Sequence, residues 1–371
     1  MKSIPVLTPH APDLDGVTLL LKEAHANKRY TNHGPLESRL RKQMASYFGD
    51  REPDNAALLS SGTAALTACL RAFDLAPGSR CLVPSWTFVG TVCAIAQAGL
   101  EPVFVDVEPD SWTPSIETIE AARKKTGAAA AVVVAPFGAA VDYGELARYS
   151  AQTGLRILID AAAAFDGMER LAAESISFPL PVMVSLHATK LASSLEGGLV
   201  LWDDPQSVRR IIAWSNFGIY DQDPITDVGC NAKLSEAHAA YGLGSIAIWP
   251  EVRIRMVEIA DRYVSLFAER NADVGFAPNV PARLATSTFN ITAPWMPAQA
   301  QAWLAAKGIE TRKWWRDGAH AIPAYSNVLC ASSLETTTRL ARTTLGIPFH
   351  YHLSPTDQAF IVDSVCELAG R

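Results

Sequence analysis

The stretch VSLHATKLASSLEGGLV, residues Val184–Val200, contains two short apolar runs joined by a loop that carries a single lysine, Lys190. Short apolar runs bounded by glycine and polar residues are typical of buried strands. We expect one strand in PVMVSLH and another in GGLVLW, with Lys190 just past the end of the first. Burial at a strand end lowers the pKa of a lysine, and the neutral amine then attacks carbonyl groups. A lysine that extends into solvent is the alternative.

Similar apolar runs alternate with helical patterns from about residue 56 to residue 245. Strands are predicted in AALLS, RCLVPSW, EPVFVDV, AAAVVVAP and LRILID, and helices in GTAALTACLRAF, TVCAIAQAG and GELARYSAQTG. This alternation predicts an α/β fold whose mostly parallel sheet is covered by helices on both faces. A long helix is predicted at Glu251–Asn271, followed by mixed α and β segments. We expect a large domain at 1–245 and a smaller α+β domain at 246–371.

Composition limits the possible functions. Hydrophobic residues make up 49% of the 371 residues, which suits a well-filled core, and the formal net charge of −6 argues against a binder of nucleic acid or anionic membranes. The six cysteines form no CxxC pair, no apolar stretch is long enough to span a bilayer, and the N-terminus lacks the apolar run of a signal peptide. We therefore expect a cytoplasmic protein. His350 and His352, without further ligands, predict no metal site.

Chemically useful residues fall after several predicted strands, where open α/β sheets bind their ligands. The turn SSGTAAL opens a helix near Gly62 and Thr63, so free N–H groups and the helix dipole favour an anion such as phosphate. Asp160 ends the strand LRILID, where its carboxylate is placed to hold a proton on a bound heterocycle. Ordinary helix caps are the alternative for both features.

Ser185, five residues before Lys190, and Phe88, in PSWTFVG, also follow predicted strands. An aromatic ring at a strand mouth can stack on a flat ligand, although most aromatic residues simply fill the core. An anion cradle, a carboxylate for a ring nitrogen, an aromatic ring and a Schiff-base lysine are together the requirements of pyridoxal 5′-phosphate (PLP). Each signal is weak alone, but the combination predicts a PLP enzyme. Lys190 would also move protons between the substrate carbon and the cofactor.

The chain resembles the sugar aminotransferases of fold type I, the DegT/DnrJ/StrS group, almost from end to end. The lysine block SLHATKLASSLEGG and the block GCNAKLSEAHAAYGL are its most specific segments. The other matching segments are RYTNHGPLESRLRKQMASYFG, SSGTAAL, VPSWTFVGT, FVDVEPDSW, ILIDAAAAF and LGIPFHYHLSPTD. The resemblance implies a fold-type-I aminotransferase with PLP as its cofactor.

The resemblance also implies roles for individual residues. Lys190 would form the internal aldimine with PLP, Asp160 would pair with the pyridine nitrogen, and Phe88 would lie against the ring. The phosphate would be held by Gly62, Thr63 and Ser185.

A homodimer with shared active sites is a further implication of the resemblance. Asn231 would reach the phosphate from the second subunit, and Lys233 in the same block would face the substrate. A surface helix cap is the alternative for both residues.

Two positions depart from the family's pattern. Ala163 stands where relatives often carry a glutamine that contacts the ring oxygen of the cofactor. Leu195 stands where a glycine is common, directly before Glu196, a candidate substrate-binding residue. The dehydratase branch replaces the lysine with histidine, so the presence of Lys190 favours transamination.

The segment GIETRKWWRDGAH, residues Gly308–His320, concentrates basic and aromatic residues in an acidic protein. Guanidinium groups suit a diphosphate and indole rings suit a base or sugar face. A solvated stripe with packed tryptophans is the alternative. The substrate candidates here are Arg312, Trp314 and His320. The Trp-Trp pair looks most like the branch that aminates dTDP-4-keto-6-deoxyglucose at carbon 4, which gives the viosamine precursor.

The resemblance implies a ping-pong reaction. L-glutamate would give its amino group to PLP, leaving pyridoxamine phosphate, which would pass the group to a nucleotide-linked 4-keto-6-deoxy sugar. The product would serve deoxyaminosugar synthesis for O-antigen, as in lipopolysaccharide, or another glycan. Amination at carbon 3 of a 3-keto sugar, or of a GDP-linked sugar, is one alternative. A PLP-binding regulatory protein and a nucleotide-binding domain without PLP are alternatives from other classes.

Overall fold

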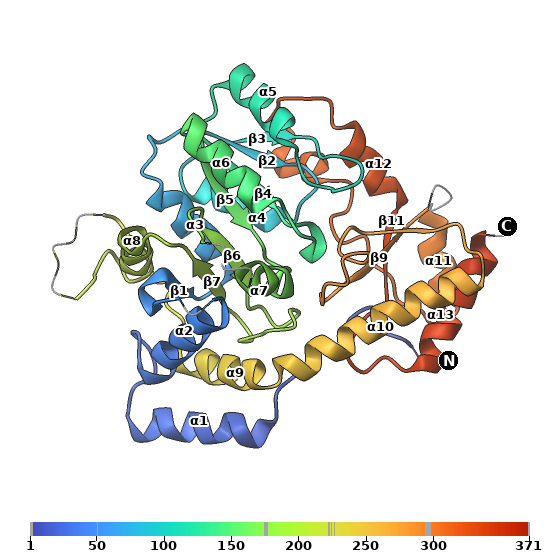
Figure 1. The fold of residues 1–371 in the computed structure, drawn as a ribbon, viewed down its shortest axis with the longest axis horizontal. Helices are drawn as coiled ribbons and strands as arrows, with labels where there is room; N and C mark the ends of the chain where they lie inside the picture. The colour runs from blue at the N-terminus through green and yellow to red at the C-terminus, as the bar shows by residue number, and fades with distance from the viewer. Residues whose placement is uncertain are drawn as a thin grey trace.

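The computed structural model describes residues 3–49, 51–173, 177–221, 223, 225, 227–293 and 298–369. Figure 1 shows a large α/β part on one side and a smaller part on the other, with the long helix α10 (Trp249–Glu269) running between them. The predicted mixed α/β class is confirmed. The helix α10 begins and ends two residues before the predicted helix Glu251–Asn271. The division of the chain at residue 245 stays a prediction.

The large sheet contains eight strands within the described residues. In spatial order they are β1 (Ala56–Leu59), β7 (Gly198–Leu201), β6 (Val182–Ser185), β5 (Arg156–Asp160), β4 (Ala130–Val134), β2 (Arg80–Pro84), β3 (Glu101–Val105) and β10 (Leu329–Cys330). Strand β7 runs antiparallel to both of its neighbours, and the other pairs are parallel. The carboxyl ends of the other strands therefore lie at one edge of the sheet.

Helices cover both faces of this sheet (Figure 1). The helices of this large part are α1 (Leu14–Ala26), α2 (Pro35–Tyr47), α3 (Gly62–Ala72), α4 (Val89–Gln97), α5 (Ile116–Thr126), α6 (Tyr143–Thr153), α7 (Phe165–Ala173), α8 (Pro205–Ser215) and α9 (Glu236–Ala247), of which α1 packs on α9 and α2. Local chemistry fixes several helix ends. Ser61 caps α3 by accepting a hydrogen bond from the N–H of Ala64, and Gly154 ends α6 in the left-handed region at φ 72°.

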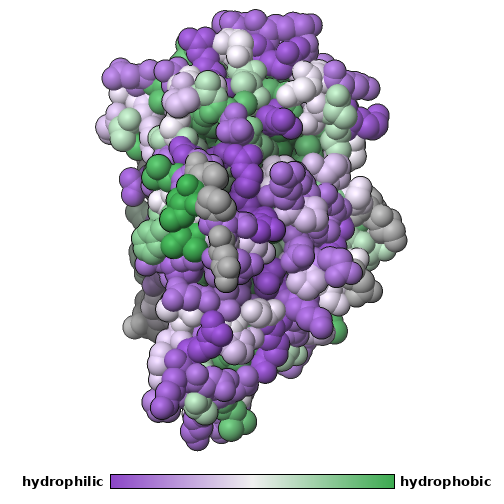
Figure 2. All heavy atoms as spheres, turned by 90° about the vertical axis from the view of Figure 1, so that its left-hand side faces the viewer, coloured by the Kyte–Doolittle hydropathy of each residue, from purple (hydrophilic) through white to green (hydrophobic). Residues whose placement is uncertain are grey.

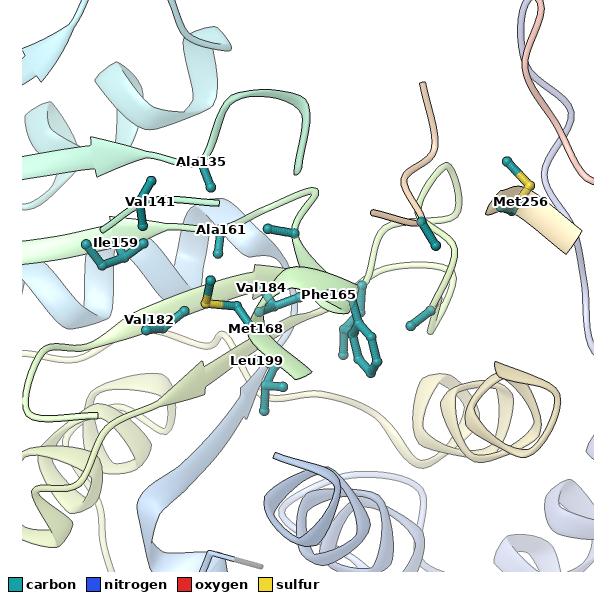
Figure 3. Packing of buried hydrophobic residues seen from close by; sticks show 14 of the residues in the cluster. Ala135, Val141, Ile159, Ala161, Phe165, Met168, Val182, Val184, Leu199 and Met256 are labelled. Atoms are coloured by element: carbon teal, nitrogen blue, oxygen red, sulfur yellow. The ribbon is translucent and has the colours of Figure 1, made fainter. Parts of the chain in front are cut away.

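Strand side chains alternate between two apolar cores, one on each face of the sheet. Ile157 and Ile159 of β5 join the core that includes α7, whereas Leu158 joins the core under α3. Figure 3 shows part of the first core, where α7 meets the strands through Phe165, Met168, Val182, Val184 and Leu199. Burying one large apolar side chain contributes about 1.5–3 kcal/mol, so both faces stabilise the sheet on which the strand ends are placed.

The smaller part is built around a three-stranded antiparallel sheet, again within the described residues. Its elements are β8 (Gly275–Phe276), β9 (Phe289–Thr292), α11 (Ala298–Ala306), α12 (Glu335–Thr343), β11 (Thr344–Ile347) and α13 (Pro355–Ala369). No helix in the described part of the chain has the length and apolar character needed to cross a membrane.

Two segments cross the predicted domain limit. Strand β10 lies beyond residue 245 in sequence, yet it pairs in parallel with β3 of the large sheet. At the other end of the chain, Ile4 bridges to Ile309, and Val6 O accepts a hydrogen bond from Phe349 N–H at 3.0 Å. Local periodicity carries no signal for such long-range pairings.

The buried carboxylate of Glu236 fixes the start of α2. Glu236 is 1% exposed, and its oxygens accept from the N–H groups of Leu36 at 2.8 Å and Glu37 at 2.9 Å. A Cβ at Gly34 would lie 2.6 Å from the Glu236 carboxyl carbon, so glycine is needed there. An acid at a helix N-terminus satisfies free N–H groups and interacts favourably with the helix dipole. One side chain of α9 thus holds the start of α2.

The loop between β6 and β7, residues 186–197, contains a strained backbone position. Leu195 has φ +66°, a left-handed conformation that costs a residue other than glycine about 1–2 kcal/mol. Its side chain is 41% exposed, so burial of the side chain does not explain the choice of residue. The position is the one where the family commonly carries glycine.

Glu236→Gln should lower the free energy of unfolding by about 2 kcal/mol, because the amide group turns a donor toward one of the two N–H groups that the carboxylate accepts from. Urea titration followed by circular dichroism measures the change. Glu258→Gln on α10, whose side chain is 61% exposed, is the matched control and should change stability by less than about 0.5 kcal/mol. Equal effects of the two substitutions would contradict the role of Glu236.

Leu195→Gly should stabilise the protein by about 1 kcal/mol, because glycine adopts positive φ without steric cost. The control is Leu191→Gly in the same loop, where a half-buried side chain packs against the core and its loss should destabilise. Thermal unfolding compares the two variants. A lower melting temperature for Leu195→Gly would show that the leucine side chain matters more than the strain.

Candidate active site

A cavity of about 940 Å³ lies at the carboxyl ends of the parallel strands. It is lined by the ends of β5 and β6, the starts of α3 and α4, the loop 186–197 and the segment 311–317. The residues predicted for the site that line it are Gly62, Thr63, Phe88, Asp160, Ala163, Ser185, Lys190, Glu196, Arg312 and Trp314. The sheet therefore gathers groups that are far apart in the sequence.

Asp160 ends β5 and is only 4% exposed. Its Oδ2 accepts a hydrogen bond from Thr91 Oγ1 at 2.7 Å, and its Oδ1 accepts one from the N–H of Ala162 at 3.1 Å. Burial raises the pKa of Asp160, and these two donors and the charge of Lys190 oppose that shift. A carboxylate oxygen has two acceptor positions, so each oxygen keeps one for a cationic partner.

Lys190 lines the same cavity from the loop after β6. Burial lowers the pKa of Lys190, and the negative charge of Asp160 partly offsets that effect. The opposite shifts of the amine and the acid have one main cause, since desolvation disfavours the charged form of both groups. A lowered pKa leaves more of the amine neutral near pH 7, the form that attacks a carbonyl carbon.

Gly62 and Ser185 lie close together in the wall of the cavity. A Cβ at Gly62 would lie 3.3 Å from both Ser185 Oγ and Met183 Sδ, so a larger residue would crowd this part of the wall. Thr63 Oγ1 lies close to Gly90 of α4, because a Cβ added at Gly90 would be 3.2 Å from it. The first N–H groups of α3 have no acceptor within the helix, and together with the hydroxyls they form a cradle for a phosphate.

Two other predicted cofactor contacts lie at the edges of this space. Phe88 precedes α4 and is 62% exposed, so its ring stands at the cavity rim rather than in the core. Ala163 has a small side chain. Its carbonyl oxygen lies near Thr286, because a Cβ added at Gly138 would be 2.5 Å from both Ala163 O and Thr286 Cγ2. The next residue, Ser287, also lines the cavity, and no sequence motif marked it.

The segment 311–317 closes the cavity with two tryptophans that pack differently. Trp315 stacks on Phe137, which follows β4, with ring centroids 3.9 Å apart and an interplanar angle of 16°. The guanidinium carbon of Arg312 lies 5.0 Å from the ring centroid of Trp314, and the indole Nε1 of Trp314 lies close to Gly346 of β11. The expected basic and aromatic cluster is therefore partly a structural bridge. Phe137 was missed because its position after a strand resembles that of an ordinary core residue.

Three predicted residues are absent from the cavity lining among the described residues. Asn231 is exposed and accepts a hydrogen bond from Lys233 Nζ at 2.9 Å, and Lys233 also lies 4.7 Å from the ring centroid of Phe217. The Nδ1 of His320 lies 2.7 Å from Ser85 Oγ at the end of β2, and burial lowers the pKa of His320. The roles proposed for these residues stay predictions.

The histidines near the C-terminus do not gather other ligands. His350 is buried, and His352 Nε2 lies 3.4 Å from His10 Nδ1. Among the residues that the structure describes, no group of three or more His, Cys, Asp or Glu side chains is arranged to hold a metal ion.

Known proteins resemble this chain along nearly its whole length. A dTDP-4-amino-4,6-dideoxy-D-glucose transaminase from Shigella dysenteriae is 26% identical over 375 residues, which cover 99% of each chain. The crystal structure of DesI with its TDP-sugar product matches with a TM-score of 0.89 and 27% identity, covering all of this chain and 94% of the other. A putative PLP-dependent aminotransferase from Bacillus cereus has the same fold, with a TM-score of 0.89 at 24% identity and coverage of 98% and 100%.

Residues 17–366 match the model of the DegT/DnrJ/EryC1/StrS aminotransferase family. The match covers nearly all of the elements that form the cavity, including the lysine loop and the segment 311–317. The family expected from the sequence blocks is thereby confirmed. The chain belongs to the DegT/DnrJ/EryC1/StrS aminotransferase family and is an aminotransferase.

Proposed function

We propose that this enzyme uses PLP to move the amino group of L-glutamate to a nucleotide-linked 4-keto-6-deoxy sugar, with dTDP-4-keto-6-deoxyglucose as the substrate. The observation that carries the proposal is the presence of Lys190 and Asp160 in one cavity with Gly62, Thr63 and Ser185. The cavity, at about 940 Å³, is at the upper end of the usual range for small-molecule sites, which suits a nucleotide sugar.

The residues present fit PLP. The cradle of Gly62, Thr63 and Ser185 would hold its phosphate, and Phe88 would cover its ring. Asp160 would accept a hydrogen bond from the protonated pyridine nitrogen, because its oxygens keep free acceptor positions and two donors stabilise its charge. When bound, PLP supplies an electron sink for charge that develops at the substrate carbon.

Lys190 has two functions in this proposal. Its amine would hold the cofactor in the resting enzyme, and it would move the proton at the substrate carbon during transfer. Both functions need a largely neutral amine at neutral pH, and burial shifts its pKa in that direction. Ala163 offers no polar side chain to the cofactor.

The basic segment supports an anionic substrate. Arg312 and Arg316 line the cavity, and no carboxylate of the described residues lies within 4 Å of either guanidinium. Lys313, by contrast, pairs with Asp317 at 2.9 Å. Guanidinium groups without a carboxylate partner suit the diphosphate of a nucleotide sugar and the carboxylates of glutamate.

The choice of sugar rests on relatives. The Shigella relative is a transaminase named for dTDP-4-amino-4,6-dideoxy-D-glucose, and the DesI structure contains a TDP-sugar product. The product made here would enter deoxyaminosugar synthesis for O-antigen or another glycan. Amination at carbon 3 of a 3-keto sugar, or of a GDP-linked sugar, would use the same cofactor site with the sugar turned differently. Mass detection of the aminated product from each keto sugar separates these reactions.

A homodimer with shared active sites is part of the proposal. The loop between α8 and α9 exposes Phe217, Ile219, Ile225 and Val228, of which Val228 is 80% exposed. This loop lies at the left edge of Figure 1, and the face that it occupies carries a green apolar patch in Figure 2. Exposed apolar patches mark protein interfaces. Asn231 lies near the end of this loop, is exposed and does not line its own chain's cavity, which suits a residue that reaches a second chain.

Borohydride reduction of the PLP-loaded protein should couple the cofactor to Lys190, as peptide mapping by mass spectrometry would reveal. Lys190→Ala should abolish this label and slow transamination at least ~100-fold, because both the attachment and the proton carrier are lost. Lys233→Ala, a lysine outside the cavity lining, is the control and should keep the label. Adding L-glutamate should bleach the yellow form of the native protein. A protein that binds PLP but is bleached by no amino donor would instead be a regulatory PLP binder.

Mixing two inactive variants tests the shared active sites. Lys190→Ala removes the lysine from its own chain's site, and Asn231→Ala removes the asparagine that would reach the partner chain's site. A dimer with one chain of each kind therefore keeps one site in which both residues are native. After subunits exchange at equal concentrations, activity should reach about a quarter of the native value, since half of the dimers are mixed and each has one good site of two. A mixture no more active than its parents would place Asn231 and Lys190 in the same chain's site.

A further inference from the structure

The loop 186–197 holds an imidazole against a carboxylate inside the cavity. His187 Nε2 lies 3.5 Å from Glu196 Oε1, within the range of an ion pair. Both residues line the cavity together with Thr189 and Lys190. Nothing in the proposed roles of Lys190 or Asp160 uses His187.

Backbone geometry determines which nitrogen of His187 carries the proton. The N–H of Thr189 points at His187 Nδ1 at 3.2 Å, and Thr189 Oγ1 lies 2.8 Å from the same nitrogen. A backbone N–H can only donate, so Nδ1 is the acceptor. The proton of the neutral ring is therefore on Nε2, the nitrogen that faces Glu196. The imidazole N–H therefore faces the carboxylate across 3.5 Å.

The surrounding loop holds this pair rigidly. The N–H groups of Leu186, Ala188 and Ser194 bond to carbonyls within the loop at 2.6–2.9 Å, and Ser193 N–H donates to Ser245 Oγ of α9 at 2.9 Å. The strained residue Leu195 lies directly before Glu196. Strain of this kind persists where the surrounding structure holds a residue in place for function.

The cavity lining carries groups of both charges. Three carboxylates line it among the described residues, and two are already engaged: Asp160 at the sheet and Asp317 with Lys313. Glu196 is 54% exposed, and no lysine or arginine of the described chain lies within 4 Å of it. The negative charge of Glu196 repels the diphosphate of a nucleotide sugar, so Glu196 suits the uncharged sugar ring of the same ligand. Carboxylate oxygens accept hydrogen bonds from sugar hydroxyls.

We propose that Glu196 accepts hydrogen bonds from the ring hydroxyls of the sugar, and that His187 is a positioning residue whose Nε2–H holds the carboxylate toward the cavity. This inference rests on the proposed function and adds the part of the substrate that this loop recognises. The guanidinium groups of Arg312 and Arg316 bind the diphosphate, and Glu196 binds the sugar ring. The pair thereby sets which way the sugar faces Lys190.

Calorimetric binding to the pyridoxal form of the enzyme tests this, because that form has no amino group to transfer. The ligands are dTDP-4-keto-6-deoxyglucose and dTDP, and the ratio of their dissociation constants reports the contribution of the sugar. Glu196→Gln should weaken binding of the sugar nucleotide about ten-fold or more and leave dTDP binding unchanged, because a charge-assisted acceptor is lost.

Two substitutions of His187 form a matched pair. His187→Gln places an amide N–H near the position of Nε2 and should keep sugar binding within about three-fold of the native value. His187→Asn places its amide near Nδ1 and should weaken binding as Glu196→Gln does. The absorbance of the bound cofactor, which depends on neither substrate, checks that the cofactor sites of all three variants are intact.

The possible outcomes separate this inference from the proposed function. If native protein gains affinity from the sugar but Glu196→Gln keeps that gain, the inference fails and the proposed function stands. If His187→Gln and His187→Asn weaken sugar binding equally, the positioning role of Nε2 is contradicted. If Glu196→Gln loses both sugar binding and bleaching by L-glutamate, Glu196 acts in a step that both substrates share, and the inference fails. Native protein that binds neither ligand would overturn the dTDP-sugar proposal and this inference with it.

Discussion

The site depends on placing one buried acid, Asp160, and one half-buried amine, Lys190, in the same cavity. Asp160 and Lys190 respond to burial in opposite directions, and each partly offsets the shift of the other. Alone, a buried charge of either sign would be costly. Together, and with Thr91 and Ala162 donating to the acid, they can be buried where a charged, flat cofactor fits. The rest of the fold keeps this pair in place.

The antiparallel strand β7 is central to that placement. Because β7 returns along β6, the loop 186–197 is tied at both ends to the sheet and holds Lys190, His187 and Glu196 in a fixed arrangement. A parallel connection would need a long crossover and would carry these groups away from each other. The strained φ of Leu195 is a local cost of this tight return.

The sequence predicted much of the site because the carboxyl ends of parallel strands meet at one edge of the sheet. Gly62, Asp160, Ser185 and Lys190 all follow apolar runs, so their convergence follows from the fold class. The stacking of Trp315 on Phe137 and the contact of Ser287 with the cavity could not be predicted, because they depend on how the segments beyond residue 280 fold back over the sheet. The bond of His320 to Ser85 has the same origin.

The sequence by itself determined the alternation of strands and helices, the family and the candidate groups at strand ends, because periodicity and short motifs are local. Tertiary structure decided the rest: β10 beside β3, Glu236 under α2, and the proton of His187 on the nitrogen that faces Glu196. Each of these depends on distances between atoms of different segments or of one folded loop. Such distances are set only when the whole chain packs, since no local pattern encodes them.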